Sequence, residues 1–197
     1  MKYSKDLIEK AVKSKGYTWF EEGDFNLNIV GIRNSQPGTL VTNLFDDILT
    51  VSYKENGVWK YHEFSCTTDP GTKGVKDFSN PKGVARLIPN QYKGMYMIGL
   101  HQNKYSALRQ KKECSVWRDK NKNMTFDEVV IDTGLFGINI HRSNPKTQSE
   151  YVENWSEGCQ VFKKVLDFNI FMTLCEKAKS MYNNSFTYTL IESKYVL

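Results

Sequence analysis

One cysteine and one histidine of this sequence stand in a pattern that suits nucleophilic catalysis. Cys159 follows Gly158 at the start of an apolar run, and His141 lies eighteen positions upstream. A thiol is mostly protonated near neutral pH, so it becomes an effective nucleophile when an imidazole accepts its proton. Such general-base help is worth about 10²–10⁴-fold in rate. The pair therefore predicts acyl transfer through a covalent acyl-enzyme.

The residues around this pair indicate how each side chain is held. In the run "GINIH", which ends at His141, successive side chains of a strand point to opposite faces. Ile138 and Ile140 then anchor the strand, and Asn139 and His141 face a cleft at its end. Gly158 lets the backbone approach a substrate carbonyl closely, and N–H groups near this turn can hold the oxygen that becomes negative.

The chain from about residue 17 to 142 consists mainly of short strand-like runs divided by turn residues. The clearest is a hairpin, in which "DILTVSYKE" and "VWKYHEF" flank the strong turn signal Asn56-Gly57. Three stretches rich in charge, proline or glycine are expected to be loops: residues 68–74, 79–92 and 111–123. A final strand is expected at 185–192. This pattern predicts a mainly β or α+β fold.

Two amphipathic segments flank the strand-rich region. Ser4 is expected to cap an N-terminal helix over 4–15, which Gly16 ends. Asp167 is expected to cap a helix from Phe168 to about Tyr182, within a C-terminal helix and strand over 167–192. Neither a repeat nor a long linker divides the chain, so residues 1–197 are expected to form a single domain.

Composition and charge exclude several classes of protein. Hydrophobic residues make up 40% and aromatic residues 13%, which is typical of a globular protein and not of a disordered one. The net charge of +5 comes from 27 basic residues interleaved with 22 acidic ones, and no nucleic-acid-binding motif accompanies it. No apolar run reaches membrane-spanning length, and the N-terminus does not have a signal peptide's apolar core. We therefore expect no nucleic-acid partner, no membrane partner and synthesis in the cytoplasm.

The cysteines and histidines do not form a metal-binding pattern. The four cysteines are scattered without a C-x-x-C pair, so neither a zinc ribbon nor a disulfide framework is expected. His101 with His141 and Cys159 lacks zinc-site spacing, so we expect no metal and no cofactor. His101 is interpreted as a substrate contact near the cleft, or as a structural histidine. Cys159 as a buried small hydrophobe and His141 as a packing residue are the non-catalytic alternatives.

The pair "INIH … SEGCQVF" resembles the signature of L,D-transpeptidases with a YkuD-type catalytic domain. Their pattern is a strand-borne histidine, a loop of about a dozen and a half residues, and then Ser/Thr-x-Gly-Cys. The resemblance implies a β-sandwich whose catalytic core covers about residues 25–165. The candidate site consists of Cys159 and His141 for catalysis, and of Gly158, Ser156, Arg142 and His101 for binding the oxyanion and the substrate.

The same resemblance implies peptidoglycan stem peptides as the substrate. Cys159 would attack the carbonyl between the L-centre of diaminopimelate and D-Ala. An amine acceptor would then complete a cross-link, as in a transferase, and water would complete a cleavage, as in a hydrolase. Cytosolic synthesis together with a cell-wall substrate suits a phage protein released at lysis or carried by a virion. That setting favours a wall-lytic peptidase or amidase.

Several alternatives stay open at this point. Glu157, Val161 and Arg142 stand where the family commonly has His, Arg and Gly. These differences agree with a non-catalytic wall-binding or virion module of the same fold. Ser156 could be a turn residue, Arg142 an exposed salt-bridging residue, and Trp155 either a core anchor or a cleft wall. A papain-like peptidase is disfavoured because its cysteine precedes its histidine. The oligomeric state is not indicated.

Overall fold

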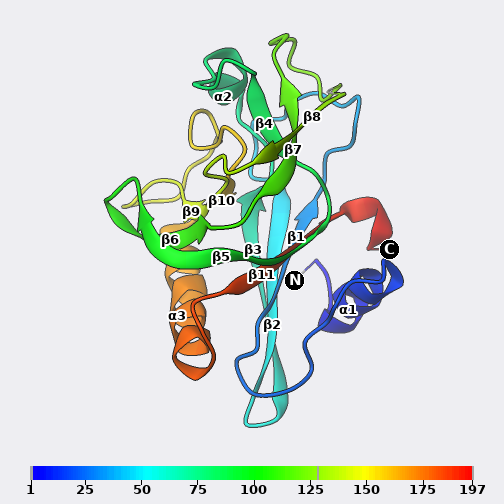
Figure 1. Ribbon diagram of the computed structural model, residues 1–197, viewed down its shortest axis with the longest axis vertical. Helices are drawn as coiled ribbons and strands as arrows, with labels where there is room; N and C mark the ends of the chain where they lie inside the picture. Colours follow the sequence, from blue (N-terminus) through cyan, green and yellow to red (C-terminus); the bar gives the residue numbers. More distant parts are fainter. Residues whose placement is uncertain (1, 128, 197) are drawn as a thin grey trace.

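The computed structural model describes residues 2–127 and 129–196, and it confirms a mainly β fold with a few short helices (Figure 1). No helix in these ranges is long and apolar enough to cross a membrane. The elements in chain order are α1 (Lys5–Ser14), β1 (Asn28–Arg33), β2 (Asp47–Glu55), β3 (Val58–Thr67), α2 (Thr72–Lys76), β4 (Val84–Leu87), β5 (Gln91–His101), β6 (Tyr105–Gln110), β7 (Cys114–Asp119), β8 (Val130–Gly134), β9 (Ile140–Arg142), β10 (Gln160–Phe162), α3 (Val165–Met181), β11 (Phe186–Glu192) and η1 (Ser193–Tyr195).

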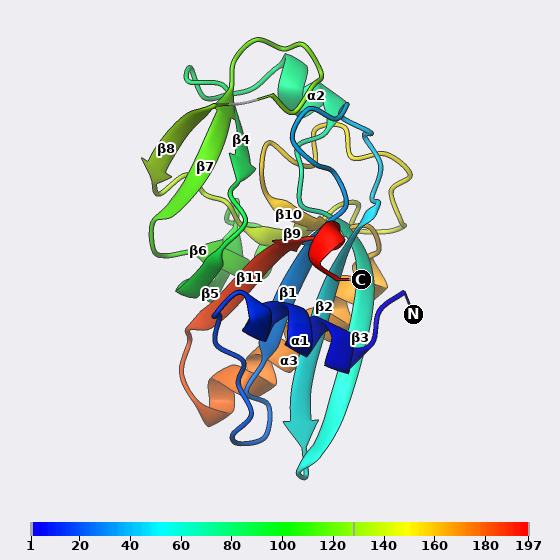
Figure 2. The same cartoon turned by 90° about the vertical axis from the view of Figure 1, so that its right-hand side faces the viewer.

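Among the described residues, eight strands close into a barrel in the order β1-β11-β5-β6-β9-β10-β3-β2. β4, β7 and β8 form a separate sheet above it (Figures 1 and 2). The expected β-sandwich is therefore corrected to a closed sheet. Closure occurs because β1 pairs with both β11 and β2, while β10 joins β9 to β3. The barrel also extends beyond residues 25–165, since it needs β11.

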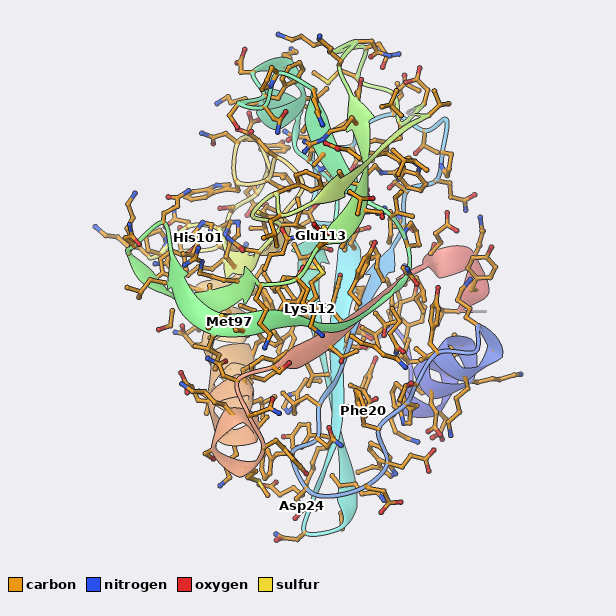
Figure 3. The ribbon with its side chains drawn as sticks, in the orientation of Figure 1. Phe20, Asp24, Met97, His101, Lys112 and Glu113 are labelled. Atoms are coloured by element: carbon orange, nitrogen blue, oxygen red, sulfur yellow. The ribbon has the colours of Figure 1, made fainter. Side chains whose placement is uncertain are left out.

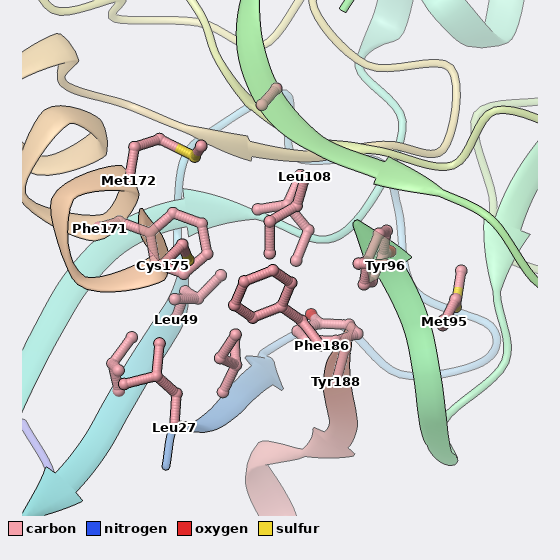
Figure 4. Packing of buried hydrophobic residues seen from close by; sticks show 14 of the residues in the cluster. Leu27, Leu49, Met95, Tyr96, Leu108, Phe171, Met172, Cys175, Phe186 and Tyr188 are labelled. Carbon is pink, nitrogen blue, oxygen red and sulfur yellow. The ribbon is translucent and has the colours of Figure 1, made fainter. Parts of the chain in front are cut away.

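Alternating side chains divide the apolar residues between the two faces of the barrel wall. Leu49 of β2 and Tyr188 of β11 belong to the main core, to which α3 contributes Phe171 (Figure 4). Val30 and Ile191 face the other way and pack against α1, which covers this part of the wall (Figure 2). The strand period of two thus produces one core inside the barrel and a second one beneath α1.

Local sequence signals predicted several elements correctly. Ser4 caps α1, and its Oγ accepts a hydrogen bond of 3.3 Å from the N–H of Leu7. The β2–β3 hairpin turns at Asn56 and Gly57, which both have positive φ (51° and 75°), as this two-residue turn requires. α3 begins at Val165, earlier than the expected Phe168. Asp167 is therefore not its cap but lies in the first turn, where its charge suits the helix dipole.

The structure corrects the expected loops at 68–74, 79–92 and 111–123. The first contains the start of α2, the second contains β4 and the third contains β7. In β4 and β7 the charged residues Arg86 and Arg118 are buried, at 1% and 5% exposure. Each binds a carboxylate, of Asp69 and Asp132 respectively. A buried charged side chain interrupts the alternation of apolar residues that identifies a strand. A strand that contains one is therefore predicted to be a loop.

Candidate active site

A cleft of about 990 Å³ lies between the barrel wall and the small sheet. The barrel lines it with residues of β5, β6 and β9, and the small sheet lines it with Ala85 of β4 and Arg118 of β7. Trp155 also lines it and is 37% exposed, so it is a cleft wall. Four of the six candidate site residues line this cleft: Cys159, His141, Arg142 and His101.

The pairing of β9 with β10 places His141 and Cys159 on the same face of the sheet. The two strands run parallel with Gln160 opposite Ile140, so Cys159 continues β10 opposite Asn139. Ile138 and Ile140 are buried in the main core, as the alternation in "GINIH" predicted. Asn139 and His141 share the opposite, cleft-lining face with Cys159. Two residues eighteen positions apart in the sequence thus line one cleft.

The imidazole of His141 is held in a defined tautomer. Its Nδ1 lies 2.8 Å from the carbonyl oxygen of Arg142, which can only accept, so Nδ1 carries the proton. The ring of His101 stacks on it at a centroid distance of 4.1 Å. Burial and the neighbouring His101 lower the pKa of His141 to about 3. His141 is therefore neutral at pH 7, and its Nε2 has a lone pair that can accept a proton.

The thiol of Cys159 is half-buried and protonated at neutral pH. Burial raises its pKa to about 11, although the N–H of Asn139, 3.4 Å from Sγ, favours the thiolate. The S–H donates to the carbonyl oxygen of Gly137, also at 3.4 Å. No hydrogen bond joins Sγ to His141 within the described ranges. A resting thiolate–imidazolium pair is thus not formed, and catalysis would need proton transfer when a substrate binds.

Hydrogen bonds to the side chain of Ser156 fix the backbone of the turn before Cys159. Ser156 is completely buried, and its Oγ donates to the carbonyl oxygen of Cys159 (2.9 Å) and accepts from the N–H of Gly158 (3.1 Å). The expected substrate role of Ser156 is corrected to that of a turn residue. Gly158 likewise cannot offer its N–H to an oxyanion, because Ser156 already holds it. The N–H of Cys159 has no acceptor within the described residues and is the remaining candidate donor.

Three further hydrogen bonds complete this turn, and sequence reasoning missed the residues that make them. The carbonyl oxygens of Ser156, Glu157 and Gly158 each accept a bond, which fixes the turn that precedes Cys159. A polar glutamine directly after the cysteine, at the start of an apolar run, was the one signal in the sequence. The N–H of Gly71 donates to the carbonyl oxygen of Ser156 (3.1 Å), and the N–H of Ala85 donates to that of Glu157 (3.3 Å). The Nε2 of Gln160 donates to the carbonyl oxygen of Gly158 (3.2 Å).

Replacing Gly158 with alanine should lower the free energy of unfolding by about 2–4 kcal/mol, from backbone strain plus overpacking. Gly158 has φ +127°, and an added Cβ would lie 2.6 Å from the carbonyl oxygen of Ala85. Gly38→Ala is the matched control, because Gly38 also has positive φ (+83°) but open space around it. Urea unfolding measures both variants. Equal losses would show that the contact with β4 is unimportant.

The other cleft residues have defined contacts. The amide Nδ2 of Asn139 lies 3.1 Å from Nδ1 of His101 and donates to it. The guanidinium of Arg142 lies over the ring of Tyr105, 4.0 Å from its centroid, and Arg142 makes no ion pair within the described residues. In the same ranges, no group of three His, Cys, Asp or Glu side chains could hold a metal ion.

No protein-family model matches this chain, and neither a curated protein nor a solved structure matches it. A part-exposed thiol and a neutral imidazole lie on the same sheet face at one cleft, beside a turn fixed by hydrogen bonds. The N–H of Cys159, which has no acceptor among the described residues, belongs to the same turn. Acyl transfer by a cysteine requires a nucleophile, a base and a hydrogen-bond donor, and groups of these three kinds are present here.

Proposed function

We propose that the protein is a cysteine acyl-enzyme that acts on peptidoglycan stem peptides, in the manner of the L,D-transpeptidases that its motif resembles. One observation carries the proposal: Cys159 and a neutral His141 line the same cleft, with Nδ1 of His141 bound to a backbone carbonyl. That carbonyl takes the orienting role that a carboxylate has in other triads. Part of the barrel and the small sheet would form the family's catalytic core.

The proposed reaction uses His141 first as a base and then as an acid. The thiol proton of Cys159 passes to Nε2 of His141 while Sγ bonds to the carbonyl carbon of the substrate. The N–H of Cys159 donates to the resulting oxyanion. The C–N bond then breaks, and the imidazolium of His141 returns the proton to the leaving amine. An amine or water then attacks the acyl carbon while His141 accepts its proton. The C–S bond breaks, and His141 passes that proton to Sγ, which frees the thiol and completes a cross-link or a cleavage.

The positions that differ from the family's usual pattern have structural roles in this chain. The Oε2 of Glu157 accepts from both the N–H and the Oγ of Ser79, at 3.0 and 2.7 Å, and so ties the turn to the chain before β4. Val161 is completely buried in β10. These substitutions leave Cys159 and His141 in place, which favours an enzyme over a non-catalytic module of the same fold.

A carbapenem, which acylates thiols of this kind, tests the proposal. Wild-type protein is expected to gain the mass of one carbapenem, and Cys159→Ala to gain none. Cys175→Ala is the matched control, because Cys175 is a completely buried thiol of α3 outside the cleft. Its adduct should persist. Failure of the wild type to form an adduct, with intact binding to cell walls, would support the non-catalytic module.

Digestion of purified peptidoglycan separates the possible reactions. New cross-links between stems identify a transpeptidase. Loss of the terminal residue identifies a carboxypeptidase, and freed stems identify an amidase or endopeptidase. The last result would fit a lytic protein that reaches the wall from the cytoplasm at lysis or with a virion. Unchanged peptidoglycan after incubation with the wild type would contradict the proposed substrate.

A further inference from the structure

Three basic side chains line the candidate active-site cleft without an ion-pair partner among the described residues. Lys104 and Arg109 come from the β5–β6 hairpin, and Arg142 ends β9. No carboxylate of the described residues forms an ion pair with any of them. Arg118 lines the cleft too, but Asp132 neutralises it at 3.2 Å. We call Lys104, Arg109 and Arg142 the cationic wall.

The charges of the cationic wall lie near the two imidazole rings of the cleft, those of His101 and His141. His101 ends β5 (Figure 3), and its ring is stacked on that of His141. Burial lowers the pKa of His101, and the charges of Arg109, Lys104 and Arg142 lower it further. All three cations are therefore close enough to affect this ring.

The cleft offers little negative charge to balance this wall. Among the described residues that line it, Glu157 is the one acidic side chain, and its carboxylate accepts hydrogen bonds from Ser79. Arg142 is also held in place, because its guanidinium packs over the ring of Tyr105. A cleft lined with one sign of charge concentrates ligands of the opposite sign. The structure thus offers a place for an anionic group near the stacked rings of His101 and His141.

We propose that the cationic wall binds free carboxylates of the substrate, so that the site selects stem peptides with unmodified carboxylates over those with carboxamides. This inference rests on the proposed function. A carboxamide is similar in size but neutral, so it keeps the shape of the substrate and loses the charge-assisted hydrogen bonds to arginine and lysine. Selection therefore depends on charge and not on fit.

Two synthetic stem peptides that differ only in carboxylate or carboxamide test the inference. Wild type is expected to prefer the carboxylate peptide roughly tenfold in kcat/KM, the effect of one charge-assisted hydrogen bond. Arg109→Gln and Lys104→Gln should each reduce this preference, whereas Arg109→Lys should retain most of it. Lys10→Gln, an equal charge change on exposed α1 outside the cleft, should leave it intact. Raising the salt concentration should weaken the preference, because exposed charges are screened.

The outcomes separate this inference from the function on which it rests. Binding of both peptides to Cys159→Ala, measured by calorimetry, should show the same preference as turnover does. Equal kcat/KM for the two peptides, in protein whose Cys159 still forms a carbapenem adduct, would overturn the inference alone. Absence of both turnover and adduct would overturn the proposed function, and the inference with it.

Discussion

Replacing His141 with alanine is expected to slow acylation of Cys159 at pH 7 by about 10²–10⁴-fold. The reason is the state of the thiol. With a pKa of about 11, only about one Cys159 in ten thousand is ionised at pH 7. In the proposed mechanism, His141 compensates for this low fraction of thiolate by accepting the thiol proton during attack. The rate of carbapenem adduct formation, followed by intact mass, measures the effect.

The pH dependence distinguishes this role from mere positioning. Because the pKa of His141 is lowered to about 3, the imidazole is already unprotonated at pH 6, and the wild-type rate should change little from about pH 6 to 8. Without His141 the rate should follow the thiolate, rising about tenfold per pH unit below pH 11. His62→Ala is the control, since His62 stacks between Tyr53 and Phe64 outside the cleft. Parallel profiles for wild type and His141→Ala would contradict general-base catalysis.

Replacing Asp69 with alanine is expected to lower the free energy of unfolding by about 3–5 kcal/mol, the usual cost of breaking a buried ion pair. Its Oδ1 lies 2.8 Å from Nε of Arg86 and 2.9 Å from Nε of Arg33, and both arginines are 1% exposed. Ser35 donates to its other oxygen. The alanine variant would leave two buried guanidinium groups without the carboxylate that they share.

Urea unfolding at pH 7 measures this loss. Asp6→Ala is the control, because the side chain of Asp6 is 85% exposed, and it should leave the stability nearly unchanged. Arg86 follows Ala85, whose carbonyl faces Gly158, so the Asp69 variant should also slow carbapenem acylation of the protein that remains folded. A loss of stability no larger than that of Asp6→Ala would show that the cluster contributes little.

The sequence by itself determined the elements whose signals are local. The hairpin at Asn56-Gly57, the cap at Ser4 and the opposite faces of Ile140 and His141 all follow from turn preference, capping or strand period, which depend on a few neighbouring residues. The expectation that His141 and Cys159 meet in one cleft also came from spacing and resemblance. Their activity remains a proposal.

The tertiary structure alone decided how the barrel closes, which pKa values the candidate site residues have and how the turn before Cys159 is held. Closure through β11 depends on pairing between segments far apart in the chain. The pKa values of His141 and Cys159 depend on burial, and Ser156 holds its turn through bonds that no motif reveals. Arg86 and Arg118 look like loop residues until Asp69 and Asp132 are brought beside them. Burial and charge pairing are set by residues distant in sequence, so only the folded chain determines them.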